Sequence, residues 1–344
     1  VVTKKGKGYK PAEEDKNGKW HGVGKFDVKT GEMLSSIPEN YKTYSQIVAD
    51  KVLKIMDKDD RVTAITPAMI SGSCMNNMFA KYPKRCFDVG IAEDHAITFA
   101  CGMALEGLRP FVSVYSSFLQ RAYDQLNHDV CRMNLPVVIG VDRCSIIGED
   151  GDSHQGVFDI SYMNSLPNMV ICEGKNSTQI EALLDLAFTQ SSPFAIRYPR
   201  GSIEYNCDHK CEVALGKWEF VVNNIDSKVS IITYGNDVCK IEKDINDNHL
   251  PYNLINALFI KPIDEEMLVS IGKLNKPIVV YTNDIIKGGL GDSILECLNK
   301  NHINVPVYIL GVDDIYVKHG SVLKVKESLG LDLNSLYHFI ERIC

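Results

Sequence analysis

Glu93 is the first residue in the sequence whose position suggests chemistry. It follows an apolar run that ends at Val89, and it begins a helical pattern that continues through Ile97, Ala100 and Met103. A carboxyl group placed beside a buried surface is a candidate for catalysis. Acidic residues are also common in the first turn of a helix, because they stabilise its dipole. From these residues alone, both interpretations stay open.

A second group of chemically capable side chains lies between residues 142 and 156. Arg143, Asp150 and His154 occur there between glycines, at a density of titratable groups that a passive connection does not need. The segment directly follows an expected strand. We therefore expect a binding or catalytic loop at this strand end.

Arginines and aromatic residues follow two further expected strands. Tyr115 ends one of them, and Phe118 and Arg121 come next on a helical pattern, where a spacing of three places them on one face. An amphipathic helix with Phe118 in the core and Arg121 in solvent explains the same spacing. Arg200 follows another strand. Guanidinium groups match the geometry of phosphate and carboxylate, so arginines at several strand ends suggest an anionic substrate.

Alternating strand and helix patterns position these side chains. Strands are expected at 62–65, 86–89, 110–115, 136–142, 169–172 and 194–198, with helices at 93–107, 118–134, 158–165 and 177–190. After a polar stretch, further strands are expected at 229–234, 252–259, 277–281 and 305–310, with helices at 237–248, 264–273 and 290–299 and two more after Ser321. Such alternation predicts two α/β domains whose mostly parallel sheets are covered on both faces. Ligands bind beyond the carboxyl ends of parallel strands, so we expect the strand-end residues to share a site.

The overall composition narrows the class of protein. The 344 residues are 45% hydrophobic and carry a net charge of −7, which is typical of a globular protein with about two or three domains. No basic run compensates the acidity, so nucleic acid is not expected as a partner. No apolar stretch reaches the length of a membrane span, so no membrane partner is expected. The eleven cysteines are scattered, which fits a reducing compartment.

The first 43 residues of the chain differ from the rest in composition and periodicity. Residues 1–43 are charged, contain glycines and lack sustained periodicity, as expected for a linker that follows a domain absent from this chain. We expect the first α/β domain to span residues 44–203 and the second to span residues 204–344.

Four segments together resemble one family of enzymes. They are DVGIAEDHA (88–96), YSSFLQRAYDQLNHDV (115–130), GEDGDSHQGVFD (148–159) and IRYPRG (196–201), with TKKGKGYKPAE (3–13) in support. They are similar to 1-deoxy-D-xylulose-5-phosphate synthase, a transketolase-like thiamin diphosphate enzyme. The resemblance implies the middle, pyrimidine-binding domain and the C-terminal domain of a three-domain protein that forms a homodimer.

The resemblance also implies an activity and its cofactors. The family condenses pyruvate with D-glyceraldehyde 3-phosphate, with loss of carbon dioxide, and its product feeds isoprenoid, thiamin and pyridoxal biosynthesis. The cofactors are thiamin diphosphate and Mg²⁺, which the N-terminal portion of the same enzyme would bind. We assign no metal site to this chain, because its Asp150-Gly151-Asp152 run has Glu149 where the metal motif has glycine. The chain alone is expected to be inactive. Bacterial relatives imply a cytoplasmic compartment, and eukaryotic ones a plastid such as an apicoplast.

Individual roles are implied by the same resemblance. Glu93 matches the acid that bonds to the aminopyrimidine of the cofactor, Phe118 the residue that stacks on it, and Lys5 a residue on its phosphate side. Arg143 and Arg200 match phosphate-binding arginines. The substrate-pocket residues that the family implies are Tyr115, Arg121, Asp150, His154 and His21. Two of these, His154 and His21, join Glu93 as catalytic candidates.

Two features depart from the family pattern, and two other functions stay open. Asp94 stands where the family usually has glutamine, and Tyr281-Thr282-Asn283-Asp284 stands where an acidic pair is expected. The chain could instead be a transketolase-type or 2-oxoacid dehydrogenase E1 β-like subunit. It could also be a non-catalytic binding or dimerisation module. The joint presence of the acid, the aromatic residue and the arginines favours an enzyme.

Overall fold

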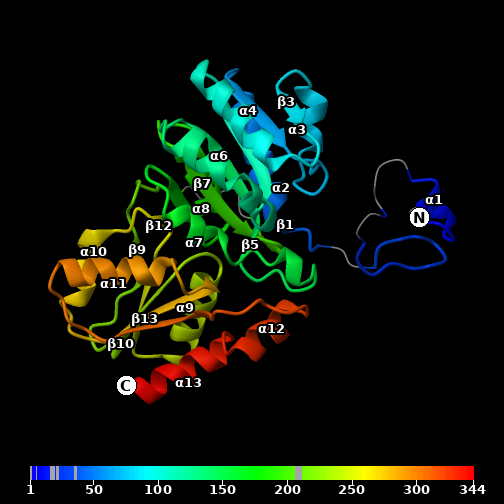
Figure 1. The fold of residues 1–344 in the computed structure, drawn as a ribbon. Coiled ribbons are helices and arrows are strands. Elements are labelled where there is room, and N and C mark those ends of the chain that lie inside the picture. The colour runs from blue at the N-terminus through cyan, green and yellow to red at the C-terminus, as the bar shows by residue number, and fades with distance from the viewer. Residues whose placement is uncertain (1, 5, 16–19, 21–22, 35–36, 206–210) are drawn as a thin grey trace.

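The computed structural model describes residues 2–4, 6–15, 20, 23–34, 37–205 and 211–344. Within these ranges, two α/β units follow one another along the chain, each built on a central sheet (Figure 1). The described part of the N-terminal segment contains α1 (Lys10–Glu13) and β1 (Tyr41–Thr43). Strand β1 pairs antiparallel with β8 (Ser202–Glu204), at the other end of the first unit in sequence.

A seven-stranded sheet organises the first unit. Its order is β12-β6-β7-β5-β4-β2-β3, and every neighbouring pair is parallel except β12 with β6. The strands are β12 (Phe259–Lys261), β6 (Val170–Glu173), β7 (Phe194–Pro199), β5 (Val138–Cys144), β4 (Arg109–Tyr115), β2 (Val62–Thr66) and β3 (Cys86–Asp88). Every residue of β2 is buried, which explains why such strands read as continuous apolar runs. The prediction of a mostly parallel sheet is confirmed.

Helices of the first unit lie around this sheet (Figure 1). They are α2 (Tyr44–Met56), α3 (Asn76–Lys81), α4 (Glu93–Leu105), α7 (Asp159–Asn164) and α8 (Ser177–Ala187), with the 3₁₀ turn η3 (Asp152–His154). Local capping fixes two of their starts. The side chain of Thr43 accepts a hydrogen bond from the N–H of Gln46 at 3.1 Å, and that of Asn176 accepts one from the N–H of Gln179 at 3.0 Å.

The helix expected at 118–134 differs from the prediction. The backbone is helical from Ser116 to Cys131, but it consists of α5 (Ser116–Leu119), the 3₁₀ turn η1 (Gln120–Ala122), α6 (Tyr123–Gln125) and the π-helix η2 (Leu126–Cys131). Each change in hydrogen-bond pattern changes the rotation per residue. The spacing of residues in the sequence therefore does not determine which of them share a face.

A five-stranded sheet organises the second unit. Its order is β14-β13-β10-β11-β9, and only β9 is antiparallel to its neighbour. The strands are β14 (Val307–Val312), β13 (Ile278–Ile285), β10 (Val229–Thr233), β11 (Tyr252–Asn256) and β9 (Glu219–Val222). The two faces have different cores, because Ile232 packs in one hydrophobic cluster and Ile231 in the other.

Helices cover both faces of this second sheet. The first cluster contains buried residues of α10 (Glu265–Gly272) and α11 (Leu290–Lys300), and it is continuous with the core of the first unit. The second contains residues of α9 (Asp237–Asn248), α12 (Val322–Leu329) and α13 (Leu333–Ile343). None of the helices in the described ranges combines the length and the apolar character that crossing a membrane requires.

One predicted strand, 252–259, is wrong. The structure divides it into β11, which belongs to the second sheet, and β12, which pairs with β6 at the edge of the first sheet. The chain passes from one sheet to the other at Ala257 and Leu258, whose backbone groups bond to Thr233 and Glu173 respectively. Residues 252–259 are buried on both sides of the crossing, and apart from Asn253 and Asn256 they are apolar, so the pattern has no signal for the change of sheet.

Candidate active site

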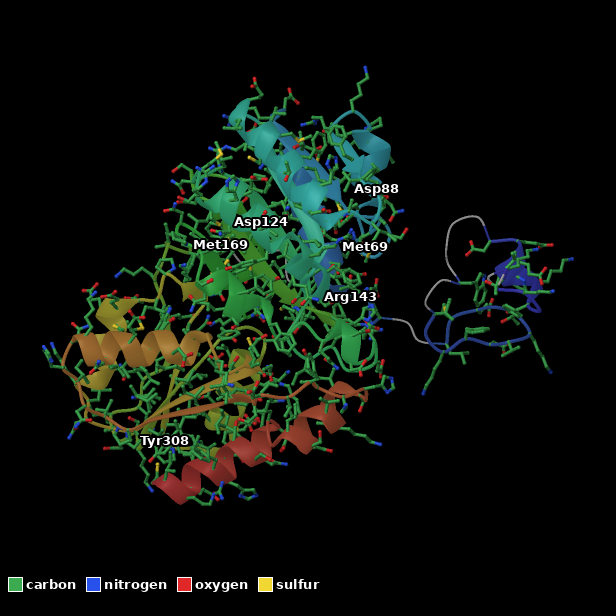
Figure 2. The ribbon with its side chains drawn as sticks, in the orientation of Figure 1. Met69, Asp88, Asp124, Arg143, Met169 and Tyr308 are labelled. Carbon is green, nitrogen blue, oxygen red and sulfur yellow. The ribbon has the colours of Figure 1, made fainter. Side chains whose placement is uncertain are left out.

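Parallel strands bring the predicted site residues to one edge of the first sheet. Glu93 follows β3, Tyr115 ends β4, and Arg143 lies near the end of β5. Figure 2 shows Asp88, Met69 and Arg143 following one another down the same side of the first unit. This is the carboxyl edge, at which open parallel sheets bind their ligands.

The Glu93 carboxylate is buried at the start of α4. Its residue is 5% exposed, and the turn before it is fixed because the Asp88 carboxylate accepts hydrogen bonds from the N–H groups of Ala68 at 2.8 Å and Gly90 at 2.9 Å. Oε2 of Glu93 accepts a hydrogen bond from Nη1 of Arg121 at 3.0 Å, and the Arg121 side chain is 55% exposed. A buried acid with an exposed partner is accessible to a ligand that displaces that partner.

Aromatic side chains form the next part of the site. The rings of Tyr115 and Phe118 stack with centroids 5.5 Å apart, and the His154 ring meets Phe118 edge-on at 5.3 Å. The Ser153 hydroxyl lies 3.0 Å from Nδ1 of His154. Phe118 and Arg121 therefore have different partners, although their spacing had suggested a common face.

The two strand-end arginines meet at Asp150. Arg143 lies 3.3 Å from this carboxylate and Arg200 lies 3.0 Å from it. The guanidinium of Arg143 also lies over the Tyr115 ring, 4.1 Å from its centroid. Both arginines line one cavity of about 620 Å³. The structure thus joins six predicted site residues in one chain of contacts, namely Phe118, Tyr115, His154, Arg143, Asp150 and Arg200.

Five other residues were named from the sequence, and the structure describes three of them. Glu93 and Arg121 form a pair of their own at the same strand edge. Lys5 and His21 lie outside the described residues. Asp94 is half-exposed, and the hydrogen bonds and ion pairs that the structure gives Glu93 within the described ranges do not include it.

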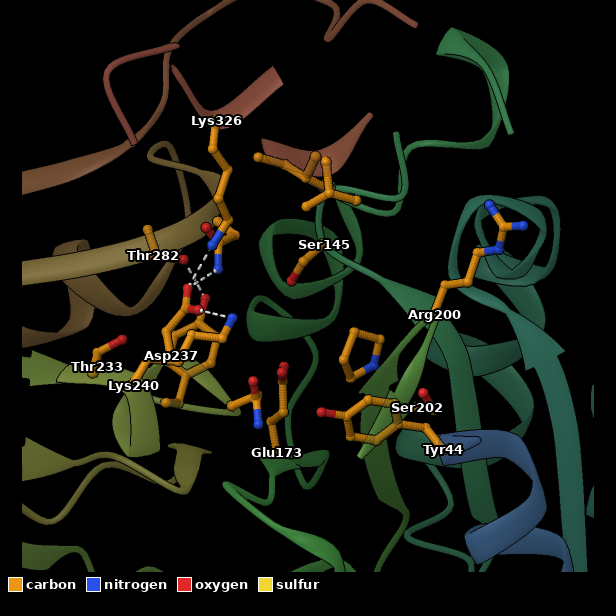
Figure 3. A pocket seen from close by; sticks show the side chains of 16 residues that line it. Tyr44, Ser145, Glu173, Arg200, Ser202, Thr233, Asp237, Lys240, Thr282 and Lys326 are labelled. Atoms are coloured by element: carbon orange, nitrogen blue, oxygen red, sulfur yellow. Dashed lines mark hydrogen bonds and ion pairs between the residues drawn. The ribbon is translucent and has the colours of Figure 1, made fainter. Parts of the chain in front are cut away.

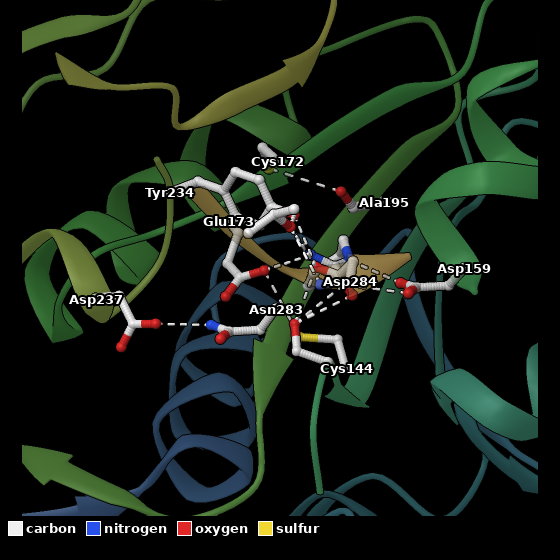
Figure 4. Close-up of polar contacts among 12 residues, drawn as sticks. Cys144, Asp159, Cys172, Glu173, Ala195, Tyr234, Asp237, Asn283 and Asp284 are labelled. Carbon is white, nitrogen blue, oxygen red and sulfur yellow. Dashed lines mark hydrogen bonds and ion pairs between the residues drawn. The ribbon is translucent and has the colours of Figure 1, made fainter. Parts of the chain in front are cut away.

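Sequence reasoning missed a buried ion cluster between the two units (Figure 4). Arg197, in the middle of β7, is fully buried and donates to Asp159 at 2.7 and 3.1 Å, to Glu173 at 2.5 Å and to Asp284 of β13 at 2.7 Å. The hydroxyl of Tyr234, the residue after β10, donates to Asp284 at 2.7 Å. The available signal was a charged residue inside a strand that was otherwise expected to be apolar.

Burial changes the acid–base behaviour of this cluster. Three carboxylates share one guanidinium away from water, and charged forms are costly there. Burial raises the pKa of Glu173 to about 8, although the charge of Arg197 opposes the change. Burial likewise raises the pKa of Asp284, again against Arg197. The cluster therefore favours binding of a proton at neutral pH.

A second cavity, of about 380 Å³, lies beside this cluster (Figure 3). One wall comes from the first unit, including Tyr44 and Arg200, and the other comes from the second unit. Asp237 accepts from Lys240 at 2.8 Å and from Lys326 at 2.7 Å. Burial alone would raise the pKa of Asp237, but the two lysines outweigh it and hold that pKa well below its ordinary value. The polar groups of this cavity thus already satisfy one another in large part.

Metal ligands do not gather in the described part of the chain. No group of three or more His, Cys, Asp or Glu side chains suited to holding a metal ion occurs there.

Comparison with known protein families identifies both units. Residues 40–205 match the transketolase pyrimidine-binding domain, and residues 216–336 match the transketolase C-terminal domain.

Named relatives are similar to the chain over almost its whole length. The 1-deoxy-D-xylulose-5-phosphate synthase of Listeria monocytogenes is 42% identical over 343 residues, which cover 98% of this chain and 56% of the relative. The same enzyme of Clostridium tetani is 45% identical over 335 residues, which cover 96% of this chain and 53% of the relative. The chain thus spans about half the length of the curated relatives that it matches.

Solved structures with the same fold include two transketolases. A split-gene transketolase, described as an inactive beta4 tetramer, superposes with a TM-score of 0.75 at 24% identity, covering 87% of this chain and 97% of the other. A transketolase of Campylobacter jejuni gives a TM-score of 0.70 at 14% identity, covering 90% of this chain and 48% of the other. The expected resemblance is confirmed, and this chain belongs to the transketolase family, of which it carries the pyrimidine-binding and C-terminal domains.

Proposed function

We propose that this chain supplies the pyrimidine-binding half of a thiamin diphosphate site. The complete protein would condense pyruvate with D-glyceraldehyde 3-phosphate, with decarboxylation, to give 1-deoxy-D-xylulose 5-phosphate. The shared name of the relatives supports this activity. The observation that carries the proposal is the acid, aromatic and arginine side chains that follow one another along a single strand edge.

The residues at this edge fit the aminopyrimidine ring of the cofactor. The buried carboxylate of Glu93 can accept a hydrogen bond from a protonated ring nitrogen once the exposed Arg121 moves aside. Phe118 offers an aromatic surface, and its ring stacks with that of Tyr115. When bound, thiamin diphosphate supplies the acidic thiazolium carbon that adds to a keto group. Glu93, Phe118 and Lys5 would hold it in this half, while the other half would hold its diphosphate and Mg²⁺.

The remaining side chains suit the handling of an anionic substrate. Asp150 holds Arg143 and Arg200 at one cavity, where two guanidinium groups can bind the phosphate of glyceraldehyde 3-phosphate. His154 lies at the edge of the Phe118 ring, where it can move a proton, a role worth ~10²–10⁴ in rate. His21 and Arg121 stay predicted members of the substrate pocket. Assembly as a homodimer, and the compartment, whether cytoplasm or plastid, also stay predictions.

Substrate profiling of the protein with both halves of the site tests this proposal. With thiamin diphosphate and Mg²⁺ present, we expect pyruvate and glyceraldehyde 3-phosphate to give deoxyxylulose phosphate and carbon dioxide, detected by mass spectrometry. Ketose phosphates should be poor donors. Efficient two-carbon transfer from ketose phosphates, without use of pyruvate, would instead establish a transketolase-type function. This chain alone should form no product with either set of substrates.

A further inference from the structure

A buried carboxyl group beside the two arginines has no role in the assignments above. Asp142, in β5, is fully buried. Its Oδ2 accepts a hydrogen bond from the Ser45 hydroxyl at 2.7 Å, whereas its Oδ1 has no hydrogen-bond partner among the described residues. Leaving a buried polar atom unpaired is unfavourable, and more so for a charged group. Such an atom in a folded protein indicates a partner supplied by something else.

The surroundings of Asp142 suggest what that partner is. Asp142, Arg143 and Arg200 line the same cavity of about 620 Å³, together with Ser45. Nε of Arg143 is also buried without a hydrogen-bond partner among the described residues. An acidic group and an arginine, both with unused hydrogen-bonding atoms, thus meet where a phosphate group is expected to bind.

Several elements present charged or titratable groups to Asp142. Arg143 comes from the same strand, Tyr115 from β4, Tyr198 from β7, and Cys74 from the segment before α3. Burial raises the pKa of Asp142 to about 7, and the hydrogen bond from Ser45, the charge of Arg143 and a hydrogen bond from the Arg143 backbone only partly oppose it. Near neutral pH, a modest change in local charge is therefore enough to change its protonation.

We propose that Asp142 is a binding residue for the phosphate group of the substrate and that it takes up a proton from solvent when this anion binds. Negative charge between Arg143 and Arg200 repels an ionised carboxylate in the same cavity, so the protonated form is favoured. A protonated carboxyl group can then donate a hydrogen bond that an ionised one cannot. The inference rests on the proposed function, in which one substrate carries a phosphate.

Calorimetry in buffers of different ionisation enthalpy measures the proton directly. The protein with both halves of the site is titrated with glycerol 3-phosphate, an unreactive probe, at pH 7.5. We expect the wild type to take up more protons per bound probe than Asp142→Asn, which keeps the shape of the side chain but cannot titrate. Above about pH 7 the wild-type affinity should fall by up to about tenfold per pH unit. The affinity of the variant should not show this fall.

A second variant keeps the test decisive if Asp142→Asn folds poorly. Ser45→Ala retains the acid but removes the hydrogen bond that favours its ionised form. The pH at which affinity begins to fall should therefore move upward. Equal proton uptake by the wild type and Asp142→Asn, or an unshifted pH profile in Ser45→Ala, would overturn the inference. Asp142-dependent uptake in a protein that makes no deoxyxylulose phosphate would contradict the proposed activity alone.

Discussion

Glu93 combines a buried carboxylate with an exposed partner, and this makes it the most informative single residue to change. Glu93→Gln keeps the size of the side chain but removes its charge and its capacity to exchange a proton. We expect kcat of the complete enzyme to fall by ~10²–10⁴. Stability should change little, because the lost partner, Arg121, is mostly in solvent, where ion pairs contribute about 0–1 kcal/mol. Steady-state kinetics and thermal melting measure the two effects.

Asp94→Asn is the matched control for this experiment. It changes an adjacent acid of the same helix turn that is half-exposed and not bonded to Glu93 in the described structure. We expect near-normal turnover from this variant. Near-normal turnover from Glu93→Gln would show that the acid only stabilises the helix start.

Residues at strand ends were predictable from sequence, whereas charged residues inside strands were not. Arg143 and Arg200 follow apolar runs, so their location required only the rule for parallel sheets. Arg197 and Asp142 lie within the runs, and their surroundings come from segments distant in sequence, including Asp284 of the second unit. No local pattern contains that information, because a buried charge depends on partners that only the tertiary structure assembles.

The loop from Ser145 to Gly156 is closed by a pair of backbone hydrogen bonds, and this closure positions Arg143. The N–H of Ser145 donates to the Gly156 carbonyl at 2.6 Å, and the reverse bond measures 2.9 Å. A Cβ added at Gly156 would overlap the Arg143 carbonyl and lie 2.9 Å from Cα of Cys144. Gly156→Ala should therefore displace Arg143, cost about 1–3 kcal/mol of stability and raise the KM for glyceraldehyde 3-phosphate. Urea denaturation and kinetics measure both.

Gly102→Ala provides the opposite case within α4. A Cβ at Gly102 would meet no other atom within 4 Å, and alanine is about 1 kcal/mol more favourable than glycine in a helix interior. We expect increased stability and unchanged KM. An unchanged KM in Gly156→Ala as well would mean that the loop closure does not control the arginine.

Element types were predictable wherever the periodicity was long and uniform. The helices α4, α8, α9 and α11 lie where sequence patterns placed them. The segment from Ser116 to Cys131 has helical periodicity throughout, yet its hydrogen-bond pattern changes three times. The run 252–259 is buried throughout although it crosses from one sheet to another. The periodicity of the sequence indicates which residues are buried. It does not indicate a change of backbone geometry when burial continues through that change.

The two units are joined by an ion cluster that titrates, which makes the stability of the whole molecule depend on pH. The pKa of Glu173 is about 8 in the folded state, against an ordinary value of 4.5. Between these values the folded protein holds a proton that the unfolded chain has lost. The free energy of unfolding therefore falls as pH rises through this window, by up to about 1.4 kcal/mol per pH unit. Above about pH 8 the contribution is constant.

Glu173→Gln should remove this part of the slope. Urea denaturation between pH 5 and pH 9 should show that the free energy of unfolding of the variant depends less on pH than that of the wild type. The two slopes should differ most between about pH 5 and pH 8. Asp142, with a pKa of about 7, leaves a residual slope in both proteins. Glu296→Gln, an exposed position on α11, should retain the wild-type profile. Parallel profiles for the wild type and Glu173→Gln would exclude Glu173 as a source of the pH dependence.

The pairing of β12 with β6 has a further consequence, which concerns association between molecules. The order of the first sheet places β12 outside β6, so a strand from the second unit closes an edge of the first. Without β12, β6 would present unpaired N–H and C=O groups along an apolar strand, which is a template for pairing with another copy. A strand of the second unit thus covers this edge of the first unit. We therefore expect the first unit to resist aggregation only when the second unit is present.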